Sequence, residues 1–102
     1  GSSHAMLSRS ATLDVELVAR LRAAVPVPLV LHGSSGVPDD ALRAAVAAGI
    51  AKVNVGTALG QAMTRAVRAA LADEAVVDPR RYLAPARAAM ADAVARVLAV
   101  LA

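Results

Sequence analysis

Two short tracts in this chain combine an apolar run with polar residues that can bind a metal or an anion. The first is residues 29–36, where Leu-Val-Leu is followed by His32-Gly33-Ser34-Ser35-Gly36. Its small residues let backbone N–H groups point at an anion, and the helix expected just beyond adds its dipole. Histidine is a common metal ligand. The tract therefore predicts a metal beside a phosphorylated ligand, although a lone histidine at a strand end is often an ordinary core or loop residue.

The second tract, residues 52–57, ends another apolar run with Asn54-Val55-Gly56-Thr57. Its amide, its hydroxyl and its exposed backbone donors are able to complete a phosphate site; the simpler interpretation is that Asn54 only caps the next helix. In βα proteins the loops at the carboxyl ends of strands bind ligands. Two such loops in succession predict one shared site.

The elements that position these tracts follow from periodicity and from proline and glycine. Apolar residues at helical spacing predict a helix over residues 12–24, with Asp14 in its first turn. A second helix is expected over residues 38–49, with capping by the Pro-Asp-Asp that opens it and an end at Gly49. Short apolar runs predict strands at 29–31 and 50–55, the first buried on both faces.

Two more helices are expected towards the C-terminus, over residues 58–72 and 85–101. Asp78 and Pro79 interrupt the helical pattern between them, and residues 80–83 are expected to form a short turn. Pro85 is placed at the first position of the last helix, where proline is tolerated. The strand-helix-strand-helix order with short connections predicts an α/β fold with parallel strands and right-handed crossovers.

The chain has 102 residues, whereas a closed (β/α)₈ barrel needs roughly 250. Two parallel strands and their helices cannot cover both faces of a sheet. The unpaired edges of the strands would also favour aggregation. Either partner chains complete the fold or the sequence is a piece of a larger one. We favour the piece.

Composition excludes several classes of protein. Hydrophobic residues make up 58%, with Tyr82 the one aromatic residue, so the core is expected to consist of Ala, Val and Leu. The absence of cysteine excludes disulfides and is compatible with a cytoplasmic protein. No apolar run is long enough for a membrane span. The formal charge is +3, but nucleic-acid binding is not expected, because the arginines are dispersed along helical faces without aromatic partners: Arg20, Arg22, Arg43, Arg65, Arg68, Arg87 and Arg96.

Three motifs in this order resemble a known family. Leu-His-Gly-Ser-Ser-Gly, then Lys-Val-Asn-Val-Gly-Thr, then Asp-Pro-Arg-Arg-Tyr-Leu before a terminal helix is similar to the C-terminal part of the class II, zinc-dependent ketose-bisphosphate aldolases. That family includes fructose- and tagatose-bisphosphate aldolases. The resemblance covers nearly the whole chain. It implies that residues 1–102 are the C-terminal segment of a single TIM-barrel domain, about strands six to eight with their helices.

The resemblance also implies roles for individual residues. His4 and His32 would be ligands of a catalytic Zn²⁺, so Gly1-Ser2-Ser3-His4-Ala5 is interpreted as native sequence in preference to a tag remnant. Asn54 would stabilise the enediolate. Arg80, with Arg81 as the alternative, would hold the distal phosphate of a neighbouring subunit's substrate. The phosphate of dihydroxyacetone phosphate, or a monovalent cation near it, would be bound by Gly33, Ser35, Asn54, Gly56 and Thr57.

The implied activity is that of a metal-dependent aldolase, which cleaves a ketose bisphosphate reversibly to dihydroxyacetone phosphate and an aldehyde. The family's third zinc histidine and its catalytic aspartate are absent from this chain, so the 102 residues alone are expected to be inactive. The expected partners are the rest of the barrel and the other subunits of a homodimer or homotetramer. Two alternatives stay open: a truncated phosphate-binding or assembly module without catalysis, and a phosphate-binding barrel lyase without a metal.

Three departures from the family pattern accompany the resemblance. Ala5 and Ser34 each replace a glycine, which affects a cation contact and backbone access, respectively. Gly56 stands where many fructose-bisphosphate enzymes have aspartate and tagatose-type members have a small residue. This last departure favours the tagatose-like subgroup.

Overall fold

The computed structural model describes residues 11–102, which form an α/β fold of four helices, one short 3₁₀ helix and a two-stranded parallel sheet. It divides into two compact units: one runs through Thr57 and includes residues 100–102, and the other is Ala58–Ala99. The elements are α1 (Val15–Ala24), β1 (Leu29–Leu31), η1 (Ser34–Gly36), α2 (Asp39–Ala48), β2 (Ile50–Val53), α3 (Thr57–Leu71) and α4 (Pro79–Leu101).

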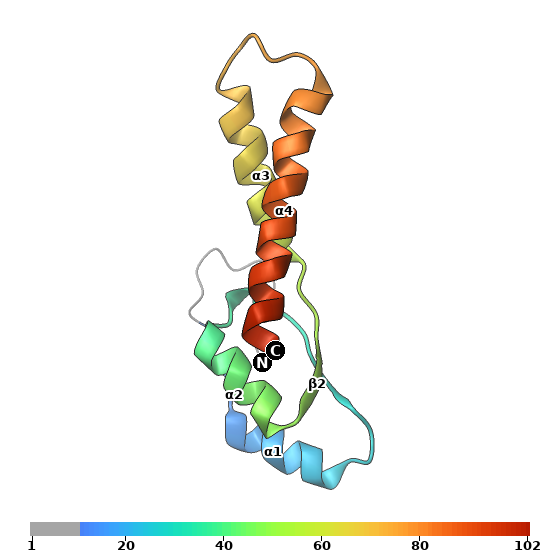
Figure 1. Cartoon of the computed structure of the whole chain (residues 1–102). Helices are drawn as coiled ribbons and strands as arrows, with labels where there is room; N and C mark the ends of the chain where they lie inside the picture. Colours follow the sequence, from blue (N-terminus) through green and yellow to red (C-terminus); the bar gives the residue numbers. More distant parts are fainter. Residues whose placement is uncertain (1–10) are drawn as a thin grey trace. The chain divides into compact units, whose positions relative to one another are not determined.

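The parallel strands β1 and β2 lie side by side in the first unit (Figure 1). The strands are joined through α2, as a parallel connection requires. Leu29 pairs with Ile50 and Leu31 pairs with Val53, with a register shift after Leu29. This register places the carboxyl ends of both strands at the same edge of the sheet.

The helices of this unit begin and end at specific backbone groups. Asp14 was expected inside the first turn of α1, but it is the N-cap, and its Oδ1 accepts a hydrogen bond of 2.9 Å from the Leu17 N–H. Side-chain capping of α2 was also expected, yet its N-cap is Pro38, which has no side-chain acceptor. Its two aspartates lie in the first turn, where they complement the dipole. Gly49 ends α2 as predicted.

A small apolar core holds the first unit together. Its buried members come from β1, α2, β2 and the residue after η1: Leu31, Val37, Leu42, Ala45 and Ile50. Val100 and Leu101 pack against this cluster. Val30, by contrast, is 42% exposed and Lys52 is exposed. Within the described residues, the strands are therefore buried on one face only, and the expectation that 29–31 is buried on both faces is wrong for these residues taken alone.

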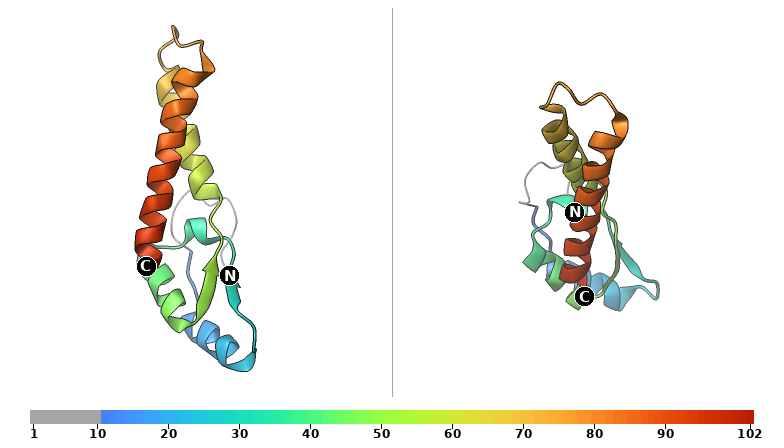
Figure 2. Two further views of the ribbon diagram at one scale, coloured as in Figure 1. Left: turned by 45° about the vertical axis from the view of Figure 1, so that its right-hand side comes forward. Right: turned by 45° about the horizontal axis from the view of Figure 1, so that its top comes forward.

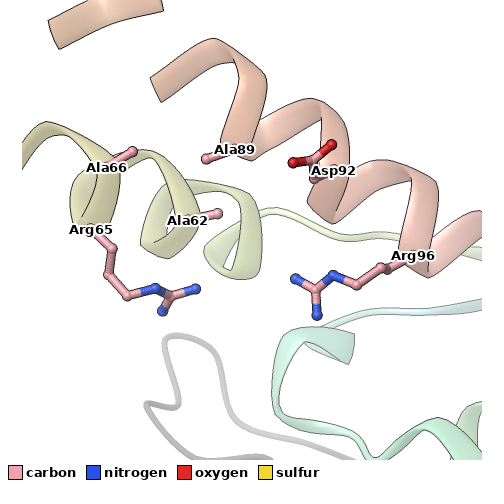
Figure 3. A pocket seen from close by; sticks show the side chains of 6 residues that line it. All are labelled: Ala62, Arg65, Ala66, Ala89, Asp92 and Arg96. Atoms are coloured by element: carbon pink, nitrogen blue, oxygen red, sulfur yellow. The ribbon is translucent and has the colours of Figure 1, made fainter. Parts of the chain in front are cut away.

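The second unit is a helical hairpin in which α3 and α4 run side by side in opposite directions (Figure 2). Alanines line a groove between them: Ala62, Ala66 and Ala89. Arg65 and Arg96 extend from different helices on the same side of this groove, with Asp92 also lining it (Figure 3).

Helix α4 begins earlier than expected. It starts at Pro79, so residues 80–83 are helical and Pro85 lies inside the helix. The start is fixed by Asp78, whose Oδ1 accepts from the Arg80 N–H at 3.0 Å, while its carbonyl accepts from the Arg81 N–H. Pro79 thus takes the tolerated first position that was assigned to Pro85. Pro85 falls in the second turn, where its missing N–H costs one backbone hydrogen bond.

Strand β2 ends at Val53, two residues before the predicted end. Residues 11–102 contain two strands, and no third strand of the expected strands six to eight occurs among them. No helix in this described range is long and apolar enough to cross a membrane.

Candidate functional site

The two polar tracts meet at the carboxyl ends of β1 and β2. Leu31 and Val53 are register partners at these ends, so His32 and Asn54 leave adjacent strands at the same level. The Asn54 N–H donates to the Leu31 carbonyl at 2.9 Å, which continues the strand pairing by one bond. The shared location expected from the sequence is therefore present in the structure for these two residues.

The side chains of His32 and Asn54 also contact each other. Asn54 Nδ2 lies 3.2 Å from His32 Nδ1. Because an amide nitrogen only donates, Nδ1 accepts this bond, and a neutral ring then carries its proton on Nε2. His32 is exposed and Asn54 is half-buried at the strand ends. The pair thus presents an imidazole and an amide at one solvent-accessible point.

Ser34 makes a second connection between the tracts. Its hydroxyl donates to the carbonyl oxygen of Asn54. Ser34 is only 3% exposed, the one buried polar residue among those described. Three of the polar groups of Asn54 are consequently bonded: its backbone N–H to Leu31, its backbone carbonyl to Ser34 and its Nδ2 to His32.

The chain turns sharply between His32 and Ser34. Gly33 has φ 65° and ψ 28°, a left-handed conformation that glycine adopts without the steric cost of a Cβ. The turn leads into η1, and the Val37 N–H donates to the Ser34 carbonyl at 3.0 Å. Ser35 lies in η1, half-buried, next to the buried Ser34.

The second tract continues into α3. Gly56 is exposed, and a Cβ built on it meets no atom within 4 Å. Thr57 is the first residue of α3, a helix of 15 residues. The first N–H groups of such a helix have no intrahelical acceptor, and its N-terminus carries a partial positive charge. These features suit a phosphate near Gly56 and Thr57.

Among the described residues, one side chain of this site is suited to bind a metal ion. His32 presents an exposed imidazole, and zinc is commonly bound by histidine nitrogen. Within residues 11–102, however, no group of three or more His, Cys, Asp and Glu side chains is arranged to hold a metal ion. His4, the other expected ligand, lies outside the described residues. A complete site therefore requires ligands in addition to His32.

Arg80 belongs to the second unit and is bound to its neighbour Asp78. Arg80 Nη2 lies 2.6 Å and Nε 3.0 Å from Asp78 Oδ2. The Arg80 side chain is 90% exposed. Hydrogen bonds from the guanidinium and the backbone N–H of Arg80 lower the pKa of Asp78, and the carboxylate raises the pKa of Arg80. The ion pair uses the Nε edge of the guanidinium, which has five N–H donors in all.

Ser34 is the residue whose contribution sequence reasoning missed. It was considered as one of the small residues of an anion-binding loop and as a replacement for glycine that narrows access to the backbone. Its burial and its bond to a residue 20 positions away depend on how η1 packs against the end of β2. The one signal in the sequence was a hydroxyl at a position where the resembling family has glycine.

Comparisons with known proteins show the family of this chain and a similar solved structure. Residues 1–102 match the family described as fructose-bisphosphate aldolase class-II. Among solved structures, the chain is similar to the crystal structure of the YdjI aldolase from Escherichia coli K12, with a TM-score of 0.83 and 33% sequence identity. That match covers 99% of this chain and 37% of the aldolase. The chain thus spans little more than a third of the length of that relative.

Proposed function

This chain belongs to the class-II fructose-bisphosphate aldolase family, and we propose that it is the C-terminal part of a metal-dependent aldolase. The whole enzyme would cleave a ketose bisphosphate reversibly to dihydroxyacetone phosphate and an aldehyde. The observation that carries the proposal is the contact of His32 with Asn54 at the carboxyl ends of two adjacent parallel strands. In α/β folds this edge is where ligands bind.

His32 is the metal ligand of this proposal among the described residues. When bound, a divalent metal supplies a Lewis acid that polarises the ketone oxygen. His4 would be a second ligand, and a third would come from the rest of the protein. A ring nitrogen of His32, Nε2 or Nδ1, can bind a metal only without its proton. Because Asn54 donates to Nδ1, this bond affects which of the two nitrogens is available to the metal.

Asn54 would stabilise the charge that develops on the substrate. Its amide nitrogen is a neutral donor. The backbone of the residue is held in place by two hydrogen bonds, one from its N–H and one to its carbonyl. A donor fixed in advance stabilises an enediolate oxygen without reorganising during the reaction. Removing one such donor from an oxyanion site costs roughly 10²–10³ in kcat.

The phosphate of the substrate would lie between the two tracts. Gly33 and Ser35 would contribute from the first, and Gly56 and Thr57 from the second, where the α3 N-terminus favours an anion. A monovalent cation beside this phosphate belongs to the same proposal. Arg80 would bind the distal phosphate of a neighbouring subunit's substrate through the guanidinium edge that Asp78 does not occupy; Arg81 is the alternative.

The rest of the enzyme would complete a (β/α)₈ barrel. The partly exposed β1 and β2 support this proposal, because parallel sheets are normally covered on both faces. So does the match to only 37% of a related aldolase. The base that removes the substrate proton would then lie outside this chain, and the 102 residues alone would not turn over. Assembly into a homodimer or homotetramer is part of the proposal.

The test is aldol cleavage by the native-length protein. Fructose and tagatose bisphosphates are supplied separately, and dihydroxyacetone phosphate is measured with a coupled dehydrogenase. We expect activity that disappears with a chelator and returns with Zn²⁺, with tagatose bisphosphate preferred because Gly56 is small. Cleavage that survives complete chelation would support the metal-free lyase instead, and no cleavage of either sugar would support the non-catalytic module.

Variants of the contacting pair sharpen this test. Asn54→Ala should lower kcat by roughly 10²–10³ and keep bound zinc, whereas His32→Ala should lose zinc as measured by metal analysis. Lys52→Ala is the matched control, because Lys52 is exposed on the same strand two residues away and has no proposed role. Equal kcat in Asn54→Ala and Lys52→Ala would refute the role of the amide.

A further inference from the structure

We infer that Ser34 is a positioning residue that acts through Asn54, and that this role is specific to a chain with a hydroxyl at this position. Ser34 follows the left-handed Gly33 and begins η1. Its side chain is buried, and it donates to the carbonyl of Asn54 on the other tract. The inference rests on the proposed function for its kinetic consequence only.

The geometry shows why this hydroxyl does not bind the substrate itself. A side chain that is 3% exposed offers no surface to a phosphate in solvent. Its donor is directed at the half-buried Asn54, whose amide contacts the exposed His32. Ser34 therefore acts on the site through Asn54.

The bond from Ser34 completes the fixation of Asn54. The N–H of Asn54 is held by Leu31, which fixes one end of its backbone to β1. Without the hydroxyl, the Asn54 carbonyl has no donor among the described residues, and the backbone of Asn54 is held from one side only. Movement of this backbone away from η1 would displace the Cα that carries the amide, which now donates to His32 at 3.2 Å. Ser34 thus holds the position of the amide on which the proposed charge stabilisation depends.

This interpretation predicts a particular kinetic pattern. Ser34→Ala should lower kcat about tenfold, or about 1.4 kcal/mol, which is at the upper end for one neutral hydrogen bond. The KM for the ketose bisphosphate should change less than about twofold, since no binding group is removed. Ser35→Ala, in the proposed phosphate site, should instead raise the KM.

A double-mutant cycle in the native-length protein separates positioning from general loss of structure. If Ser34 acts through Asn54, then Ser34→Ala should have no further effect on kcat in the Asn54→Ala background. Effects that multiply would overturn the inference, and so would a Ser34→Ala variant with wild-type kcat. A raised KM at unchanged kcat would assign Ser34 to phosphate binding instead and would also overturn it.

A second measurement does not depend on catalysis. Amide hydrogen exchange followed by mass spectrometry should show faster exchange over residues 54–57 in Ser34→Ala, with exchange over α2 unchanged. If the wild-type protein has no aldolase activity, the proposed function fails, while this exchange result still decides whether Ser34 holds Asn54. Unchanged exchange would overturn the inference.

A variant that keeps the side-chain volume covers the case in which Ser34→Ala does not fold. Ser34→Cys retains nearly the same size with a weaker donor. It should lower kcat several-fold in the wild-type background and have no effect in Asn54→Ala. A Ser34→Cys variant that behaves the same in both backgrounds would contradict the positioning role.

Discussion

Gly49 connects α2 to β2. Its replacement by alanine tests how the fold positions β2 and the site residue Asn54 that follows this strand. The residue has φ +121° and ψ 14°, and its N–H donates to the carbonyls of Ala45 and Val46 at the end of α2. Ile50, the next residue, begins β2. A change at Gly49 therefore acts on the strand that carries Asn54.

Three terms determine the cost of Gly49→Ala. A Cβ at this position would lie 2.6 Å from Arg22 Cγ and 3.0 Å from both Cβ and Cδ of the same side chain. Moving the Arg22 side chain off its rotamer costs about 0.5–1.5 kcal/mol. The positive φ costs about 1–3 kcal/mol for a residue with a Cβ, and the reduced entropy of the unfolded chain offsets about 0.4–1 kcal/mol. We expect a net loss of about 2 kcal/mol in the free energy of unfolding.

Urea denaturation of the single variants Gly49→Ala and Arg22→Ala and of their double variant measures these terms. Arg22→Ala removes Cγ and Cδ, so Gly49→Ala should cost about 0.5–1 kcal/mol less in that background. Gly60→Ala is the matched control, because Gly60 lies inside α3 with open space around its Cβ position; it should stabilise by about 0.8–1 kcal/mol. A Gly49→Ala protein as stable as wild type, or equally destabilised in both backgrounds, would refute the reasoning.

Three further predictions concern the core, the α4 N-terminus and the second tract. Leu42→Ala removes a side chain that is 3% exposed and should cost about 2–5 kcal/mol in urea unfolding, whereas Leu98→Ala, at a position 61% exposed, should cost far less. Asp78 has a pKa below its usual 3.8 because of its bonds to Arg80, so its stabilising contribution is present above pH 3.8 and is lost as the pH falls through the lowered value. Asp78→Asn should therefore be less stable than wild type near pH 7, and the difference should shrink in acid; a pH-independent difference would contradict the ion pair. Gly56→Asp should fold, since a Cβ at this position meets no other atom and the residue precedes the first turn of α3. Its stability in thermal unfolding should rise by a few tenths of a kcal/mol. The variant should cleave fructose bisphosphate faster relative to tagatose bisphosphate, and an unchanged ratio would exclude this position from substrate choice.

Several elements could be predicted because they depend on nearby residues. The strand Leu29–Leu31 was confirmed with its bounds, since prolines precede it and a glycine follows within two residues. Gly49 was confirmed as the end of α2 for a similar reason, because few other residues adopt its backbone conformation. The family resemblance was also confirmed, as three separate motifs carried it.

Other features were mispredicted where two local signals compete. Pro79 and Pro85 are both acceptable first residues of a helix, and the choice of Pro79 depends on the carboxylate of Asp78 bonding to the Arg80 N–H. Asp14 fits either the first turn or the N-cap of α1, and the bond to the Leu17 N–H selects the cap. Such choices involve only one hydrogen bond, about 1 kcal/mol, which residue patterns do not resolve.

The sequence by itself determined where β1 ends and that His32 and Asn54 belong to one edge of a sheet, although β2 ends two residues earlier than predicted. Short-range rules suffice there, because apolar runs stop where polar residues and glycine begin. The tertiary structure alone decided how these residues bond to one another. The register of β1 against β2 brings Asn54 Nδ2 within 3.2 Å of His32 and its carbonyl to the hydroxyl of Ser34. Those contacts join residues 20 and 22 positions apart. Their geometry depends on the packing of η1 and α2, the elements that connect the two strands along the chain.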